Sequence, residues 1–90
     1  MQIEFDSAKR DKTLAERGLD FARAGEVFAQ AAATAQDTRF AYGENRFITF
    51  GQLNGRLVVV AWTPRGAVRR IISMRKANDR EQARYAQRMG

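Results

Sequence analysis

The sequence predicts an α+β fold with a small antiparallel sheet, and two observations carry this prediction. Two runs of β-branched and aromatic residues meet at Asn54-Gly55, a dipeptide typical of a tight β-hairpin. Upstream, apolar residues recur at helical spacing within residues 21–33. With 90 residues, of which 44% are hydrophobic and one is proline, the chain has room for one small core. We therefore expect a single domain at residues 1–90.

The first third of the chain predicts a short strand and two helices. Residues 2–5 alternate between polar and apolar side chains, as a strand does. Asp6 or Ser7 can then cap a helix that ends at Gly18. A second helix is predicted from Phe21 to Ala33, because its apolar residues recur every three or four positions.

The centre of the chain predicts a loop followed by a three-stranded meander. Residues 34–45 show no regular period and contain turn residues, so we predict a loop there. The hairpin "RFITFGQLNGRLVVVAWT" follows at residues 46–63, and apolar residues on both of its faces predict a central place in the sheet. A type I′ turn at Asn54-Gly55 sets its register, which pairs Leu53 with Arg56, Phe50 with Val59, Ile48 with Ala61 and Phe47 with Trp62.

A third meander strand and a C-terminal helix complete the predicted fold. "TPRG" at residues 63–66 predicts a turn with Arg65 exposed at its tip, and the strand Val68–Arg75 follows it. Asn78 and Glu81 have capping-box spacing, so we predict a helix that runs from there through Arg88. Simple alternation along the strand places Arg69, Ile71, Ser73 and Arg75 on one face and Arg70, Ile72, Met74 and Lys76 on the other.

The charge of the chain is strongly uneven. Residues 1–45 contain six basic and eight acidic side chains, whereas residues 46–90 contain ten basic and two acidic ones. A well-solvated surface would explain some of this excess. So large an asymmetry in a small domain nevertheless favours a polyanion or an acidic protein as partner.

The residue content excludes several classes of chemistry. The chain has no cysteine for disulfide or thiolate chemistry, and no histidine, the commonest acid/base group near neutral pH. No nucleophile motif, glycine-rich phosphate loop or metal-ligand cluster is visible, so we expect neither a metal nor a cofactor. No apolar stretch is long enough to cross a membrane, and the start does not look like a signal segment, so we expect a soluble cytoplasmic protein.

What remains is a basic sheet edge with aromatic residues between the charges. Arginines on the hairpin, on the turn and at both ends of the third strand can ring one surface. RNA is bound through its phosphates and by stacking on aromatic rings, so this surface predicts an RNA partner. Core packing is the competing interpretation for Phe47, Phe50 and Trp62, whereas Tyr85 lies on a polar helix.

The chain also carries residue types that metal-free RNA cleavage requires. Such cleavage needs a base for the 2′-hydroxyl, cations for the transition-state phosphate and an acid for the leaving 5′-oxygen. Arginine suits the second role, but it stays protonated and therefore cannot fill the other two. Those two roles remain open among Glu44, Glu81, Lys9, Lys76 and Tyr85. For Glu81, a structural role in the capping box competes.

Three segments of the chain together resemble one protein family. They are "FDSAKRDKTLAERGLDFARAGEVF", "DTRFAYGENRFITFGQLNGRLVVVAWTPRG" and "RRIISMRKANDREQARY", in this order and over nearly the whole chain. In these segments the chain resembles the BrnT family of bacterial type II toxins, most closely from Asp37 to Tyr85. Matching positions include Arg39, Gly43, Glu44, Arg46, Gly51, Gly55, Thr63, Arg65 and the stretch that begins at Arg70.

The resemblance implies a fold, an activity and partners. The fold would be related to RelE-type ribonucleases, and the activity would be RNA cleavage that blocks translation. The partner would be a BrnA-type antitoxin, and operator DNA would be bound only through the antitoxin complex. By position, the family pattern implies site residues at Lys9, Glu44, Arg46, Arg65, Arg69, Arg70 and Arg75. We expect Lys9, Glu44, Arg65 and Arg75 to act in cleavage, and Arg46, Arg56, Arg69, Arg70, Lys76 and Tyr85 to bind RNA.

One departure from the family pattern leaves the function open. The family usually has Lys-His-Gly in the first helix, where this chain has Glu16-Arg17-Gly18. If that histidine takes part in cleavage, Arg17 removes activity and leaves fold and antitoxin binding; if it only packs or caps, the change is neutral. Our leading prediction is a metal-independent endoribonuclease toxin. The alternatives are a non-catalytic module that binds nucleic acid or antitoxin, and a domain whose basic face serves only an acidic partner.

Overall fold

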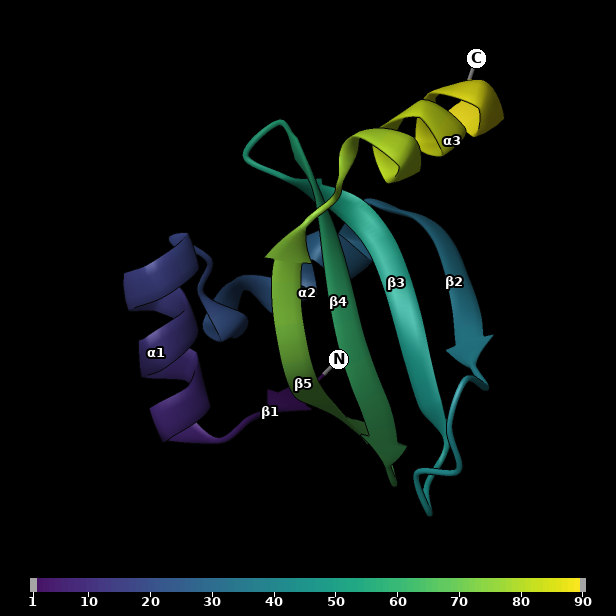
Figure 1. Ribbon diagram of the computed structural model, residues 1–90. Helices are drawn as coiled ribbons and strands as arrows, with labels where there is room; N and C mark the ends of the chain where they lie inside the picture. The colour runs from purple at the N-terminus through teal and green to yellow at the C-terminus, as the bar shows by residue number, and fades with distance from the viewer. Residues whose placement is uncertain (1, 90) are drawn as a thin grey trace.

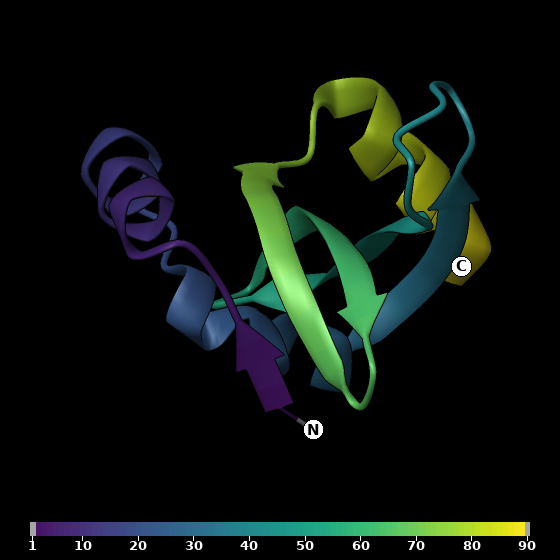
Figure 2. The same cartoon turned by 90° about the horizontal axis from the view of Figure 1, so that it is seen from below.

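The computed structural model of the protein describes residues 2–89. Its elements, in chain order, are β1 (Gln2–Glu4), α1 (Ser7–Arg17), the 3₁₀ helix η1 (Phe21–Arg23), α2 (Ala24–Ala29), β2 (Ala31–Asp37), β3 (Arg46–Leu53), β4 (Arg56–Arg65), β5 (Val68–Lys76) and α3 (Asp79–Met89). The strands form one five-stranded sheet in the order β1-β5-β4-β3-β2 (Figure 1). Figures 1 and 2 show α2 behind this sheet, α1 beside its β5 edge and α3 over one end of the opposite face.

The N-terminal strand and first helix are confirmed. The side chain of Asp6 caps α1 by accepting hydrogen bonds from the backbone N–H groups of Ala8 and Lys9, at 2.8 and 3.2 Å. α1 ends at Gly18, whose φ of 70° lies in the left-handed region that glycine adopts without strain.

An ion pair and a backbone hydrogen bond tie α1 to the rest of the fold. Asp20 accepts hydrogen bonds from Nε and Nη2 of Arg10 at 2.8 and 3.0 Å, and from the N–H of Ala22 at 2.9 Å. Further along α1, Arg17 donates to the carbonyl oxygen of Met74 at 2.7 Å. Because no residue of α1 is fully buried, these polar contacts contribute a large part of its attachment.

The second helix is present as η1 and α2, but it is shorter than predicted, and part of the predicted loop is a strand. The helical segment ends at Ala29, and Ala31–Asp37 forms β2, an edge strand antiparallel to β3. Alanine favours helices locally, but pairing along β3 satisfies the backbone of this segment and overrides that preference. Thr34 supports the pairing, since its hydroxyl oxygen lies 2.9 Å from that of Thr49 on the neighbouring strand.

The sheet is larger than predicted, and it is mixed where a purely antiparallel sheet was expected. The predicted meander is confirmed as β3, β4 and β5, each antiparallel to the next, but β4 continues to Arg65, so the turn predicted at residues 63–66 lies at residues 66–67. β2 adds a strand beside β3, and β1 adds a parallel strand beside β5, with Ile3 opposite Arg69. The hairpin is therefore internal, as its two apolar faces predicted.

The hairpin has the predicted register throughout. Its turn residues have positive φ angles, 54° at Asn54 and 73° at Gly55, as the predicted turn requires. The four predicted pairs are all present: Phe47 with Trp62, Ile48 with Ala61, Phe50 with Val59 and Leu53 with Arg56.

β5 carries a bulge that the sequence did not predict. Ala61 on β4 lies opposite Ser73, but the next residue, Trp62, lies opposite Ile71, so Ile72 is an extra residue. The extra residue reverses the alternation of side chains partway along the strand. Ile71 and Met74 consequently both point into the same core, where they are 2% and 0% exposed.

Two apolar clusters lie on opposite faces of the sheet. The larger one packs under η1 and α2 and consists of Leu19, Phe21, Ala24, Val27, Leu53, Val58, Val60, Trp62, Ile71 and Met74. The smaller one packs under α3 and consists of Leu57, Val59 and Ala77, with Ile48, Phe50 and Tyr85 against it. On the face of the sheet that carries the second cluster, α3 covers one end, and much of the rest has no helix over it (Figure 1).

Gly51 allows α2 to approach β3 closely, so Gly51→Ala should destabilise the protein by about 1–3 kcal/mol. A Cβ at this position would collide with the carbonyl oxygen of Val27 and would lie 2.9 Å from its Cγ1. The matched control is Gly25→Ala on α2, whose Cβ would meet nothing within 4 Å. It should be neutral or stabilising by about 0.5–1 kcal/mol. Urea unfolding followed by Trp62 fluorescence measures both, and equal midpoints for the two variants would contradict the close approach.

The Arg10–Asp20 pair predicts a specific loss of stability in acid. The hydrogen bonds from Arg10, and then that from the Ala22 N–H, lower the pKa of Asp20 from its ordinary value of 3.8. The ionised carboxylate therefore stabilises the fold fully above about pH 5, and this contribution is lost as the pH falls through 4. Asp20→Asn keeps a capping residue but removes the charge.

The stability difference between wild type and Asp20→Asn should thus be constant from pH 5 to 7 and shrink below pH 4, as measured by urea unfolding at each pH. Asp11→Asn is the control, because Asp11 is an exposed partner of the same guanidinium and should contribute little. A difference between wild type and Asp20→Asn that does not change with pH would show that the charge of Asp20 is unimportant.

Candidate nucleic-acid interface

The sheet face opposite α2, which we call the open face, presents three rows of side chains. Val58 and Val60 of β4 pack under α2, so the alternating residues Val59 and Ala61 point to the open face. Cross-strand pairing then defines the rows, which are Asp37, Arg46, Thr63 and Arg70; Ala35, Ile48, Ala61 and Ser73; and Ala33, Phe50, Val59 and Arg75.

Most side chains in the middle row of the open face are small, and the charged side chains stand in the rows beside it. Three of its four side chains are small, namely those of Ala35, Ala61 and Ser73. Neighbouring strands are about 4.8 Å apart, and alternate residues of one strand about 6.7 Å apart. This row of small side chains between arginines, which we call the floor, lets an extended polyanion lie close to the backbone of the sheet. The bulge at Ile72 puts Arg70 and Arg75 on the same face, whereas simple alternation predicted opposite faces.

Arg75 stands at the end of the open face that α3 covers. Its Nη1 and Nη2 donate to the two carboxylate oxygens of Glu81 at 2.7 and 2.9 Å. Glu81 also accepts from the N–H of Asn78 at 2.9 Å, so the predicted capping box is confirmed. The hydrogen bonds from Arg75 lower the pKa of Glu81, and those to Glu81 raise the pKa of Arg75. This arginine is thereby held in place and fully charged.

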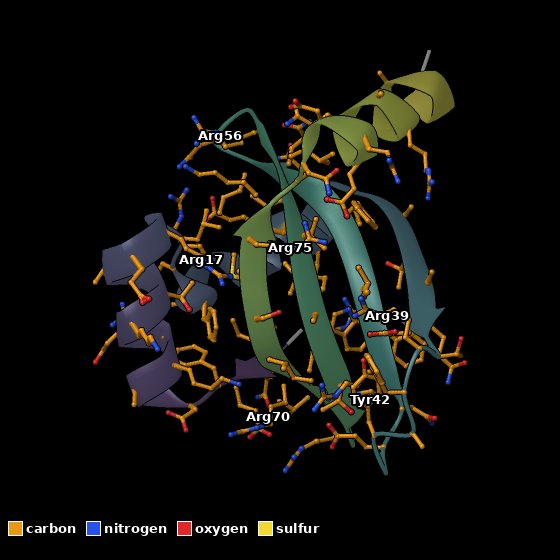
Figure 3. All side chains as sticks on the ribbon, in the orientation of Figure 1. Arg17, Arg39, Tyr42, Arg56, Arg70 and Arg75 are labelled. Atoms are coloured by element: carbon orange, nitrogen blue, oxygen red, sulfur yellow. The ribbon has the colours of Figure 1, made fainter. Side chains whose placement is uncertain are left out.

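A second fixed arginine, Arg39, follows β2. Its Nε and Nη2 donate to the two oxygens of Asp37, both at 2.9 Å, and the hydroxyl of Tyr42 donates to the same carboxylate at 3.0 Å. These hydrogen bonds, those from Arg39 first, hold the pKa of Asp37 well below its usual range. The charge of Arg39 in turn opposes the protonation of Arg75, so the two guanidiniums lie within electrostatic reach of each other. Figure 3 shows both in front of the central strands.

Arg39 was not among the site residues named from the sequence. Residues 34–45 were predicted to be a loop, so nothing in the period of the sequence placed Arg39 near the sheet. Two signals were available: Arg39 matches the family pattern, and an aspartate stands two positions before it, which allows the paired contact found here.

Glu44, Arg46 and Arg65 meet at the end of the open face away from α3. Nε of Arg46 lies 3.4 Å from one Glu44 oxygen, and Nη2 of Arg65 lies 3.8 Å from the other. The Arg46 guanidinium also lies over the ring of Tyr42, 4.0 Å from its centroid. Glu44 is thus held more loosely than Asp37 or Glu81, each of which binds an arginine through both oxygens.

The structure separates the other predicted site residues from these arginines. Arg69 lies on the α2 side, where its guanidinium stacks on Phe28 and Trp62 at 4.4 and 4.5 Å from the ring centroids. Tyr85 is an exception, because it packs against the cluster under α3 and lines a hollow of the open face together with Phe50 and Glu81, the partner of Arg75. Lys9 lies in the first turn of α1, and Arg56 and Lys76 line two hollows near the tip of the β3–β4 hairpin. Arg70 remains on the open face beside Glu4, 3.7 Å away.

Neither a membrane span nor a ready metal site is found within residues 2–89. No helix there has the length and apolar content to cross a bilayer. Histidine is absent from the chain, and the described residues bring no three potential ligand side chains of the Asp or Glu type together.

Comparison with known proteins assigns the chain to a family. A search of curated protein sequences found no match. A family model described as "Ribonuclease toxin, BrnT, of type II toxin-antitoxin system" matches residues 5–81, which span α1, η1, α2 and the strands β2 to β5 and end at Glu81, the partner of Arg75. The match confirms the resemblance found in the sequence and covers most of the chain. The chain therefore belongs to the BrnT family of ribonuclease toxins of type II toxin–antitoxin systems.

Proposed function

We propose that the open face binds RNA and cleaves it without a metal ion. The observation that carries this proposal is the low floor of Ala61 and Ser73, which lies between arginines that aspartate and glutamate hold in fixed positions. Fixed guanidiniums stabilise the charge that develops on a phosphate during cleavage and need no rearrangement to do so. Arg39, Arg46, Arg70 and Arg75 are the residues we assign to this role.

The proposed reaction is an internal transesterification. The 2′-oxygen of one nucleotide attacks the adjacent phosphorus, a new O2′–P bond forms, and the P–O5′ bond breaks. The products are a 2′,3′-cyclic phosphate and a free 5′-hydroxyl. The proton of the 2′-hydroxyl goes to a base, and the leaving 5′-oxygen takes up a proton.

We assign the role of base to Glu44. Asp37 and Glu81 each engage an arginine through both oxygens, and both pKa values are lowered, so these carboxylates are poor proton acceptors. Glu44 makes only the longer contacts, at 3.4 and 3.8 Å, and keeps lone pairs available. Arg65 stands beside it with 55% of its side chain exposed and can reach a phosphate near this base.

The position of Arg17 supports cleavage that does not use a histidine. Its guanidinium donates to the carbonyl oxygen of Met74 and lies on the α1 side of β5 (Figure 3). Arg75 follows Met74 on β5, and its side chain points to the open face. Arg17 therefore holds the strand that carries Arg75 and does not face the proposed substrate. On this proposal the family histidine has a structural role, and its replacement by Arg17 leaves activity intact.

A type II toxin implies a protein antitoxin as partner. We propose a BrnA-type antitoxin that neutralises the toxin by covering the arginines of the open face, and operator DNA that is bound only by the resulting complex. Acidic side chains of the antitoxin would suit this face. We further propose that uncovered toxin cleaves RNA in the cytoplasm and thereby inhibits translation.

One observation favours a second function, in which the open face binds RNA without cleaving it. Two carboxylates of this face are engaged with arginines, Lys9 lies on α1, and Lys76 lies near the tip of the β3–β4 hairpin. Glu44 is then the single proposed proton acceptor there, and RNA held out of its reach would be bound intact. Such binding would depend mainly on phosphate contacts and would weaken steeply with salt.

Arg75→Ala should reduce RNA cleavage by about 10²- to 10³-fold, the typical cost of removing one donor to a transition-state anion. The matched control is Lys12→Ala, which removes the same charge from an exposed position on α1 and should change cleavage little. Cleavage of a labelled single-stranded RNA by the purified proteins measures both effects, with circular dichroism to check folding. Equal losses in the two variants would mean that net charge, and not the position of Arg75, matters.

Glu44→Gln should abolish most cleavage but preserve RNA binding, because it keeps the size of the side chain and removes the base. A loss of about 10²- to 10⁴-fold is expected for a general base. The assay is run in excess EDTA, with anisotropy for binding and mass spectrometry for the cyclic phosphate. Cleavage that needs added Mg²⁺, or that survives in Glu44→Gln, would contradict this mechanism. Binding without cleavage by the wild type would establish the second function.

A further inference from the structure

Phe40 is an unusual residue on the surface of this protein. Its side chain is 67% exposed, whereas Leu14 on α1, the other large apolar side chain that is exposed within residues 2–86, is 39% exposed. Aromatic rings normally contribute to a core, where each buries a large apolar area. An aromatic ring left in water at the edge of a charged face is a candidate contact for a ligand.

The loop that carries Phe40 is held in place at both sides of the ring. Arg39 donates to the Asp37 carboxylate from its backbone N–H as well as from its guanidinium. Tyr42 donates to the same carboxylate, and its ring meets that of Phe40 in a T-shaped contact with centroids 5.7 Å apart. Edge contact with Tyr42 sets the orientation of the Phe40 ring. The exposure of that ring leaves area free for a stacking partner.

Two guanidiniums, each of them paired with a carboxylate, lie beside this pair of rings. The Arg39 guanidinium lies 5.9 Å from the centroid of Phe40, and the Arg46 guanidinium lies 4.0 Å from that of Tyr42. Contacts therefore run without a break from Phe40 through Tyr42 to Arg46 on the open face. A ring flanked by cations suits a ligand that carries a flat π-system and a negative charge together, and a nucleotide has both.

We infer that Phe40 stacks on one unpaired base of the RNA whose phosphates lie on the open face. The substrate class is consequently single-stranded RNA, because bases inside a duplex are already stacked and hidden from the ring. Such stacking accepts any base, so Phe40 positions the strand without reading its sequence. This inference rests on the proposed RNA-binding function of the open face.

The test uses the full chain and a 2′-O-methyl oligonucleotide, which cannot form the cyclic phosphate, with binding measured by fluorescence anisotropy. Phe40→Ala should weaken binding about five- to 150-fold, the range that corresponds to about 1–3 kcal/mol for one stacked base. Phe40→Trp should bind like the wild type, and its added indole emission should be quenched by the oligonucleotide. Leu14→Ala, which shortens the other exposed apolar side chain, should bind like the wild type.

A second oligonucleotide with abasic positions distinguishes stacking from a general surface effect. Removal of the base that Phe40 contacts should weaken binding of the oligonucleotide to the wild type. The same removal should not further weaken its binding to Phe40→Ala. Phe40→Leu keeps an apolar side chain and loses the ring, so wild-type affinity in this variant would overturn the stacking contact.

Three further results would overturn the inference in different ways. If the wild type cleaves RNA and Phe40→Ala binds the oligonucleotide equally well, then Phe40 has no part in binding while the proposed function stands. If Phe40→Ala keeps its RNA affinity but escapes neutralisation by a co-expressed antitoxin, then the ring belongs to a protein contact. A wild type that neither binds nor cleaves single-stranded RNA would overturn both the inference and the proposed function.

Discussion

The arrangement of the open face depends on the extra residue that β5 carries at Ile72. Ile71 and Met74 are both needed in the core under α2, although their spacing in a regular strand would put them on opposite faces. The bulge resolves this conflict, and in doing so it turns Arg70 and Arg75 to the same side of the sheet. One local irregularity thus fills the core and also gathers the charge of the site.

The elements that could be predicted from the sequence are those that local chemistry decides. Asn54 and Gly55 both accept positive φ angles, so the turn and with it the register of the hairpin followed from two residues. Asp6, Asn78 and Glu81 indicated where two helices begin, because capping acts over three or four positions. β2 had no such signal. Its alanines favour a helix, and only β3 on the other side of a loop makes them a strand.

The candidate site was predicted in part, for the same reason. Charge asymmetry pointed to the arginines of the meander, and the structure places Arg46, Arg65, Arg70, Arg75 and Glu44 at the open face or its end. Which arginines share that face depended on the bulge, for which the sequence offered no signal. Arg69 consequently lies on the opposite side, over Phe28 and Trp62. Arg39 was missed because its position follows from β2, which tertiary pairing alone creates.

The position of β5 in the sheet has a consequence for the order of events during synthesis. β5 is made after the other four strands, yet it lies between β1 and β4 and carries Arg70 and Arg75. Gln2 therefore pairs with Val68, a separation in sequence that makes this contact slow to form. A nascent chain that has not yet released β5 from the ribosome has an incomplete sheet and lacks both Arg70 and Arg75 on it. The open face can therefore form only after β5 has left the ribosome and has inserted between β1 and β4.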